Sequence, residues 1–324
     1  MLYNNIRQIR TSSTSLLKRH NHAVAVQLDY YMSPQFAGVA SALVNNTYAS
    51  KGIDLTFLPI CPVGLEQERV RIHQDENPQY LSIGTVEQNI FTPTLKGNPN
   101  LRTSAIAAMF SKSPLCIASL PSKDGESFTP DIIGAHEDSV EIMKKIFPQH
   151  QVVASPRSTK TRDLLSGKVG AIQAYTTTEV PTLRRVLHAD PDVIEMERYN
   201  GAKLGYSQVI FAADECLDGD DRKDVARAFC EATFEGWANV IENPAEAVEM
   251  VKEAKLMLGL DDESNDHWHP SPEFELEMVQ KCSEYVKGTM SRGKYGVIDE
   301  ERWGEANEWL LSGKAFGLNA SVWK

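Results

Sequence analysis

The chain has 324 residues, of which 24% are charged and 42% hydrophobic; this is the composition of a globular protein with one large or two medium domains. Its formal net charge of −11, without a basic block, argues against a nucleic acid or an anionic membrane as partner. No stretch approaches the ~20 apolar residues of a membrane span, and five scattered cysteines without a CxxC pair indicate reduced, mostly buried thiols.

The first 21 residues differ from the rest of the chain. They carry Arg7, Arg10, Lys18 and Arg19 among several serines and threonines, and no acidic residue precedes Asp29. This composition is typical of an organellar transit peptide, and a disordered polar N-terminus is the alternative. We therefore expect either a mitochondrial or other organelle matrix location, or the cytoplasm.

Residues 24–58 read as a strand, a polar loop, a helix and a second strand. Val24, Val26 and Leu28 alternate as in a strand, and Lys51-Gly52 ends the helix because glycine readily takes the left-handed C-terminal position. The unit has the length of a βαβ crossover. Its polar and aromatic residues follow the first strand, where open α/β sheets bind ligands.

In the remaining chain, segments with the period of a strand alternate with segments with the period of a helix. Further strands are expected at 80–84, 101–110, 115–120, 131–134, 151–154, 169–175 and 205–213. Helices are expected at 66–77, 85–96, 140–147, 161–166, 221–241, 244–258, 272–290 and 299–311. In the helix at 66–77, Leu65, Val70 and Ile72 are the expected buried stripe, and Thr85 is the expected N-cap of the next helix.

Two groups of strands separated by a polar loop at 121–130 indicate two lobes. The pattern predicts a largely parallel α/β fold. We assign residues 22–120 and 208–324 to lobe 1 and residues 121–207 to lobe 2. The strand at 205–213 is expected to return the chain to lobe 1.

Several stretches, in order, resemble one known family. They are LDYYMSPQFAGVASAL at 28–43, KGIDLTFL at 51–58, SIGT at 82–85, residues 105–120, LLSGKVGA at 164–171 and GYSQVIFAADE at 205–215. The resemblance spans about residues 23–254. It is to the family that contains thiamine-pyrimidine precursor-binding proteins, sulfonate-binding proteins and fungal hydroxymethylpyrimidine phosphate synthases.

The resemblance implies a type II periplasmic-binding-protein-like fold, with mixed sheets flanked by helices and a ligand cleft between two lobes. It also implies that Tyr30 stacks on a pyrimidine or pyridine ring. The fungal members are synthases that consume pyridoxal phosphate and their own histidine, with iron. The resemblance implies that this chemistry uses a lysine and a histidine after the Ile-Gly strand end, a glycine-rich phosphate loop and a run of cysteines near the return strand. In this chain no lysine or histidine occurs within residues 85–90. Glu137 and Asp138 stand where the phosphate loop would lie, and the run of cysteines is absent.

Lobe 1 supplies seven candidate ligand-binding residues: Asp29, Tyr30, Gln35, Phe36, Gly84, Thr85 and Glu87. Tyr30 offers a ring for stacking, whereas Tyr31 is expected to point to the opposite side. Asp29 is a hydrogen-bond acceptor for an aminopyrimidine or, alternatively, a local turn or cap residue. Phe36 either lines the opening of the ligand site or belongs to the hydrophobic core. Glu87 either pairs with the ligand or is a carboxylate placed favourably in the first turn of a helix.

Lobe 2 and the return strand supply five more candidates: Tyr175, Thr176, Glu179, Tyr206 and Ser207. A polar loop with a capping threonine is the alternative for the first three. The pair His267 and His269 is a candidate for a metal site, with an ordinary loop as the alternative. His136, beside Glu137 and Asp138, is a candidate for a metal or for acid–base chemistry, with a solvated helix N-terminus as the alternative.

These observations and the resemblance predict an intracellular binding protein for a small aromatic heterocycle, namely a thiamine-pathway pyrimidine precursor. A diverged pyrimidine synthase is the alternative, and only that alternative calls for pyridoxal phosphate or iron. The expected partner is a small-molecule ligand, without nucleic acid or a membrane span, and the sequence leaves a homodimer open.

Overall fold

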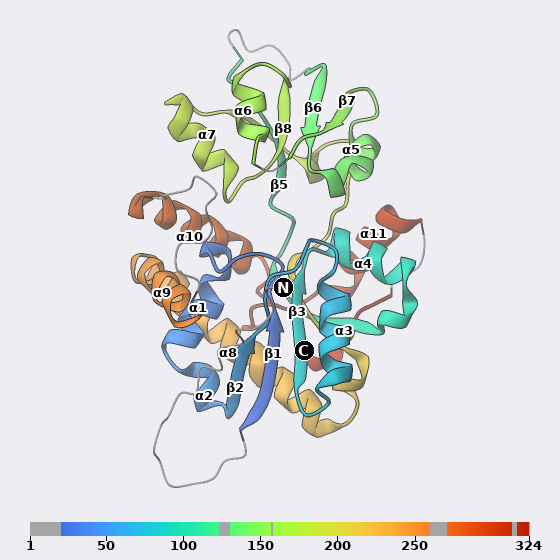
Figure 1. The fold of residues 1–324 in the computed structure, drawn as a ribbon, viewed down its shortest axis with the longest axis vertical. Coiled ribbons are helices and arrows are strands. Elements are labelled where there is room, and N and C mark those ends of the chain that lie inside the picture. The colour runs from blue at the N-terminus through green and yellow to red at the C-terminus, as the bar shows by residue number, and fades with distance from the viewer. Residues whose placement is uncertain (1–20, 123–129, 157, 260–270, 313–315, 324) are drawn as a thin grey trace, which may run out of the picture.

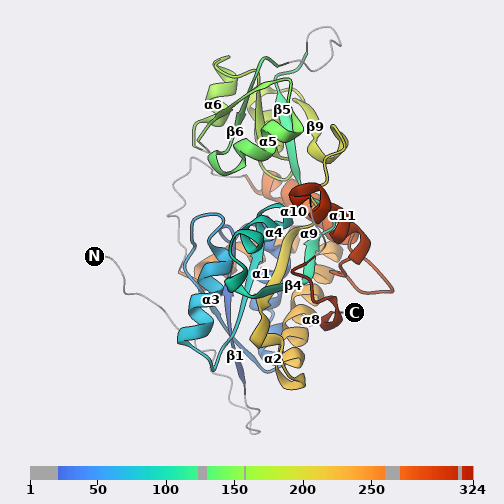
Figure 2. The ribbon, with the colours of Figure 1, turned by 90° about the vertical axis from the view of Figure 1, so that its right-hand side faces the viewer.

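The computed structural model describes residues 21–122, 130–156, 158–259, 271–312 and 316–323. The expected leader, apart from Asn21, and the His267–His269 pair lie outside these ranges. The chain forms two lobes, one above the other in Figure 1, and Figure 2 shows α10 and α11 beside the junction between them. In the part of the chain described here, no helix is both long and apolar enough to cross a membrane.

Lobe 1 is built on a five-stranded sheet with the order β2-β1-β3-β10-β4. β1 pairs in parallel with β2 and β3, and β10 runs antiparallel to β3 and β4. The strands are β1 (His22–Gln27), β2 (Ile53–Phe57), β3 (Leu81–Val86), β4 (Thr103–Phe110) and β10 (Ser207–Ala213). The opening βαβ unit and the return strand are therefore confirmed.

Lobe 2 repeats this plan with the order β7-β6-β8-β5-β9. β6 pairs in parallel with β7 and β8, while β5 runs antiparallel to β8 and β9. The strands are β5 (Leu115–Ser119), β6 (Ile132–Ala135), β7 (Gln151–Ala154), β8 (Ala171–Tyr175) and β9 (Asp192–Glu195). The edge strand β9 had no counterpart among the predicted strands.

The lobe boundary differs from the expected one. β5 belongs to the second sheet, so the chain crosses at residues 111–114 and not at the 121–130 loop. Residues 121–130 join β5 to β6 of the same sheet, so they do not connect the two lobes. The second crossing lies between β9 and β10.

Helices cover both sheets. Those of lobe 1 are α1 (Ala37–Val44), α2 (Thr47–Ser50), α3 (Glu66–Glu76), α4 (Gln88–Gly97), α8 (Asp220–Glu242), α9 (Pro244–Met257), α10 (Pro272–Lys287) and α11 (Glu300–Leu311). Those of lobe 2 are α5 (Val140–Ile146), α6 (Lys160–Leu165) and α7 (Glu179–Leu187). The largest core cluster joins β1 and β3 to α1 and α8, with Phe36 and Trp237 at its centre.

Two local predictions were wrong. In α3 only Val70 of the expected stripe is buried, because the helix packs through Glu66, Gln67 and Gln74, and Leu65 and Ile72 are exposed. Thr85 is not a helix cap: β3 continues through Val86, and Glu87 occupies the N-cap position of α4. All five cysteines are free and buried, as expected.

Candidate functional site

The two sheets present equivalent edges to each other. In sheet 1 the carboxyl ends of β1 and β3 meet the start of β10, where Val209 lies opposite Val86. In sheet 2 the carboxyl ends of β6, β7 and β8 meet the start of β5, where Leu115 lies opposite Tyr175. Because residues 111–114 alone connect the end of β4 to the start of β5, these edges must face each other.

At the lobe 1 edge, Asp29 is held by residues from two other strands. Thr85 Oγ1 donates to Asp29 Oδ1 at 2.7 Å, and Gln208 Nε2 donates to Asp29 Oδ2 at 3.2 Å. Burial raises the pKa of Asp29, and the hydrogen bonds from Thr85 and Gln208 oppose this effect. Besides a contact with its own backbone, the Asp29 carboxylate thus has two side-chain partners that are distant in the sequence.

Next to Asp29, two tyrosine rings are exposed to solvent. Tyr30 and Tyr31 retain 40% and 46% of their accessible surface. Their rings form an edge-to-face pair with centroids 5.3 Å apart. The expectation that Tyr31 points away was wrong, because strand alternation ends at Gln27 and the tyrosines follow in a loop.

Glu87 and Ser207 form a second pair on the same edge. The Ser207 hydroxyl donates to Glu87 Oε1 at 3.1 Å, and both side chains are buried. The Glu87 side chain does not cap its own helix α4. The carboxylate is thus tied to the return strand, beside the Asp29 network.

The lobe 2 edge carries a buried lysine with an unusual set of neighbours. Lys160, 2% exposed, places its Nζ 2.7 Å from His136 Nε2, 3.2 Å from the Gln173 carbonyl and 2.5 Å from Glu179 Oε1. His136 follows β6, and its ring is stacked near Tyr175 at the end of β8. One ammonium group therefore links the ends of β6 and β8 to the start of α7.

Glu179 completes this network. Its Oε2 accepts hydrogen bonds from the Tyr175 amide at 2.9 Å and the Thr178 hydroxyl at 2.6 Å. Burial opposes the charge on Glu179, but the Lys160 ammonium and these hydrogen bonds overcome it and lower its pKa to about 2. The Glu179 carboxylate is therefore ionised, and its hydrogen bonds fix the loop between β8 and α7.

Residues of α10 and α11 contact lobe 2 and the two segments in which the chain crosses between the lobes. The Thr176 hydroxyl lies 2.5 Å from the Tyr285 hydroxyl of α10. Arg302 of α11 binds both oxygens of Glu197 and the carbonyls of Ser111 and Gly205, so it contacts both crossings.

Three predicted ligand residues have structural roles instead. Phe36 is fully buried in the lobe 1 core, so the core alternative is the correct one. Gly84 packs beneath Phe211, since a Cβ there would lie 2.3 Å from the ring. Tyr206 is buried, accepts a hydrogen bond from the Asp299 amide and lies under Arg302 at the hinge. Gln35 is half-buried within the short helix Pro34–Phe36.

The predicted site omitted Lys160 and Gln173, and it gave His136 only a weak role. His136 is buried and not, as the alternative held, at a solvated helix end. Its position directly after a strand was a usable signal, because parallel strands end at a common edge. Lys160 lies in a charged helical stretch, where nothing in the sequence marks it as buried.

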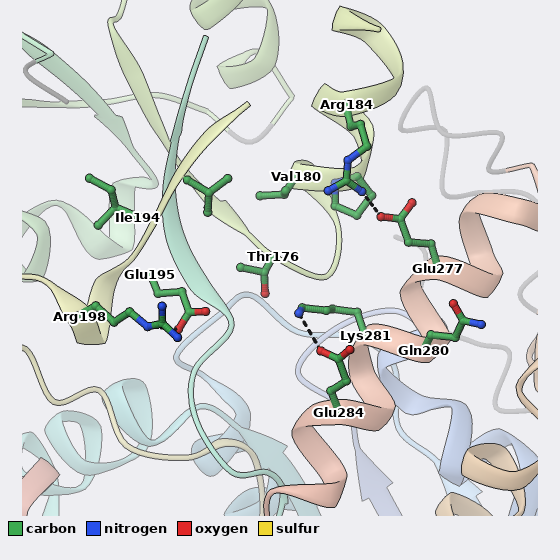
Figure 3. A pocket seen from close by; sticks show the side chains of 12 residues that line it. Thr176, Val180, Arg184, Ile194, Glu195, Arg198, Glu277, Gln280, Lys281 and Glu284 are labelled. Carbon is green, nitrogen blue, oxygen red and sulfur yellow. Dashed lines mark hydrogen bonds and ion pairs between the residues drawn. The ribbon is translucent and has the colours of Figure 1, made fainter. Parts of the chain in front are cut away.

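A cavity of about 690 Å³ also lies between the lobes, bordered by α7, β9 and α10. Figure 3 shows α7 and α10 facing each other across it, with an ion pair between Arg184 and Glu277 and a second pair, Lys281 with Glu284, on α10. Of the twelve predicted residues only Thr176 borders it. Its three cations and three carboxylates balance, so the cavity favours neither sign of charge.

The residues that the structure describes include no group of three His, Cys, Asp or Glu side chains placed to hold a metal ion. His136 has nitrogen donors for neighbours, namely the Lys160 ammonium and the Gln173 amide.

Comparisons with known proteins agree on the architecture. A family model described as "NMT1/THI5 like" matches residues 147–247. A comparison with curated proteins returned no match.

Solved structures match over nearly the whole chain. The periplasmic aliphatic sulphonate binding protein SsuA from Escherichia coli is 9% identical, with a TM-score of 0.60 over 94% of this chain and 92% of that one. SsuA from Xanthomonas axonopodis pv. citri, solved with MOPS, is 7% identical, with a TM-score of 0.56 over 93% and 97%. The Candida albicans CA3427 gene product is 15% identical, with a TM-score of 0.55 over 90% and 89%. The chain thus has the type II periplasmic-binding-protein fold, as predicted.

Proposed function

We propose that this protein binds a small, flat heterocycle between its two lobes, and that the heterocycle is an aminopyrimidine of the thiamine pathway. The observation that carries the proposal is the juxtaposition of Asp29 with the exposed Tyr30 ring. An acceptor fixed by two hydrogen bonds beside an aromatic face suits a ring that bears N–H groups. The similarity to the "NMT1/THI5 like" family model supports the choice of ligand.

Charge at the facing edges favours such a ligand over a sulfonate or phosphate. Across the described part of the two edges, Lys160 is paired with Glu179 and Lys112 with Glu195. Asp29 and Glu87 add acceptors on the lobe 1 side. An oxyanion would meet carboxylates there, whereas an amine or a ring N–H would meet acceptors.

The synthase alternative requires groups that the described residues do not fit. They offer no three-ligand cluster for iron. Lys160 has its ammonium engaged by three partners and is almost fully buried, so it is not presented for a covalent link to pyridoxal phosphate. We therefore propose binding as the function and derive no reaction step.

Calorimetric titration tests the proposal. We expect wild-type protein to bind 4-amino-5-hydroxymethyl-2-methylpyrimidine and not MOPS. Replacing Asp29 by Ala should weaken binding about 10- to 100-fold, because a charge-assisted hydrogen bond contributes roughly 1.5–3 kcal/mol. Asp29→Asn should lose less, since it keeps one acceptor. Binding of MOPS but not of the pyrimidine would overturn the proposal.

A further inference from the structure

We propose that Gln208 reads the amino group of the ligand and thereby sets specificity at the lobe 1 edge; this inference rests on the proposed function. Gln208 is the second residue of β10, and its side chain reaches Asp29. Three independent features of this one residue, in its backbone, its donor and its acceptor, support the assignment.

The first feature is the backbone. Gln208 has φ = 52°, a left-handed conformation that is unfavourable for a residue with a long side chain. In the described ranges, six other non-glycine residues have positive φ, and they lie at helix ends or in turns. Gln208 instead lies inside a strand. Strain that the surrounding structure maintains is characteristic of binding and catalytic sites.

The second feature is how the amide is oriented. Nε2 donates to Asp29 Oδ2 at 3.2 Å, so the carboxylate determines which end of the amide faces it. The opposite orientation would place Oε1 against a carboxylate oxygen. Asp29 thus turns the Gln208 carbonyl oxygen away from itself.

The third feature is that this oxygen has no donor. Gln208 is 4% exposed, and within the described residues its Oε1 is buried without a hydrogen-bond partner. A buried acceptor that lacks a donor is destabilising in the free protein. A ligand N–H that reached Oε1 would remove this penalty, whereas an isosteric methyl or an oxyanion would not.

Asp29 and Gln208 together present acceptor oxygens at the start of the loop that carries the tyrosine pair. Thr85 Oγ1 donates to Asp29 Oδ1 at 2.7 Å and accepts a hydrogen bond from the Asp29 amide at 3.1 Å, so this hydroxyl holds both ends of Asp29. The chemistry that this surface recognises is an exocyclic amine on a ring stacked nearby. The exposed Tyr30 and Tyr31 rings lie on the side from which a ligand would approach this surface.

A comparison of two ligands in three proteins tests the inference. The ligands are 4-amino-5-hydroxymethyl-2-methylpyrimidine and the same pyrimidine without its amino group. Wild-type protein should prefer the amino compound at least tenfold. Gln208→Met, which keeps the length of the side chain but removes both polar atoms, should reduce this preference to less than twofold.

Gln208→Gly separates function from folding. Glycine adopts a positive φ without strain, so we expect this variant to unfold at a temperature equal to or above that of the wild type and yet to lose the amino preference. His188→Gly is the matched control, because His188 has φ = 51° at the far end of α7; it should keep the preference.

The possible results are distinguishable. If wild-type protein binds neither pyrimidine, the proposed function fails. If it binds the amino compound and Gln208→Met retains the full preference, the proposed function stands and the role of Gln208 is refuted. A loss of the preference in Gln208→Gly together with a markedly lower unfolding temperature would also refute it, since the residue would then be structural.

Discussion

The two facing strand-end edges have the same topology but opposite chemistry. On lobe 2, the buried residues Lys160, His136 and Gln173 form a network with the partly exposed Glu179, and the Lys160 ammonium has three partners in it. On lobe 1, the edge around Asp29 is acidic and leaves the buried Gln208 Oε1 without a donor in the described structure.

This difference assigns a stabilising role to the lobe 2 edge and a ligand-binding role to the lobe 1 edge. A satisfied buried network stabilises one arrangement of the strand ends, and removing one member leaves an uncompensated charge. An edge with unsatisfied acceptors has binding capacity left for a ligand. We therefore expect lobe 2 substitutions to change stability and lobe 1 substitutions to change affinity.

The largest expected effect is on Lys160. Lys160→Met should lower the free energy of unfolding by about 3 kcal/mol, because it leaves the Glu179 carboxylate, whose side chain is only 18% exposed, without its counter-charge. Urea denaturation measures the loss.

Lys168→Met is the control for this prediction. Lys168 also lies in lobe 2 and pairs with Asp163 at 3.1 Å, but its side chain is 68% exposed. An exposed pair contributes roughly 0–1 kcal/mol. Equal losses in the two variants would contradict the structural role assigned to the buried lysine.

The pH dependence of stability should distinguish the two carboxylates by sign. The pKa of Glu179 is lowered to about 2 from 4.5, so its stabilising effect is complete above pH 4.5 and is lost as the pH falls towards 2. The pKa of Asp29 is raised above 3.8 by burial, so its contribution is most favourable at low pH and declines as the pH rises through the folded-state pKa.

Unfolding free energies from pH 2 to pH 7 test this contrast. The difference between Glu179→Gln and wild type should become more unfavourable as the pH rises from 2 to 4.5. The difference between Asp29→Asn and wild type should become more favourable above pH 3.8. Slopes of the same sign would show that the two edges do not differ in the way described.

Local sequence signals predicted most of the fold and part of the candidate site. Alternation and glycine stops located the opening βαβ unit, the return strand and the C-terminal helices, because these signals are local. The same logic brought Asp29, Thr85 and Glu87 to one edge. The lobe boundary was misplaced, since a polar loop such as 121–130 has the same composition at a hinge and within a lobe.

The roles of several individual side chains could not be predicted, because they depend on contacts between segments that are distant in the sequence. Phe36 follows the polar loop but is buried in the core, and Gly84 serves the packing of Phe211. Lys160 lies 24 residues from His136 and 19 from Glu179 in a helix with a charged sequence. Its burial arises only when α6, β6 and α7 come together.

The smallest expected effect concerns the tyrosine pair, and it tests which ring meets the ligand. Tyr30→Ala should weaken pyrimidine binding about two- to tenfold, corresponding to the ~0.5–1.5 kcal/mol of an aromatic contact. Tyr30→Phe should bind like the wild type, because it keeps the ring. Tyr31→Ala is the matched control: Tyr31 is equally exposed and touches Tyr30 edge-on, so its loss should matter less. If titration shows a greater loss for Tyr31→Ala than for Tyr30→Ala, the stacking surface belongs to Tyr31, and Asp29 must be reached from that ring's side of the loop.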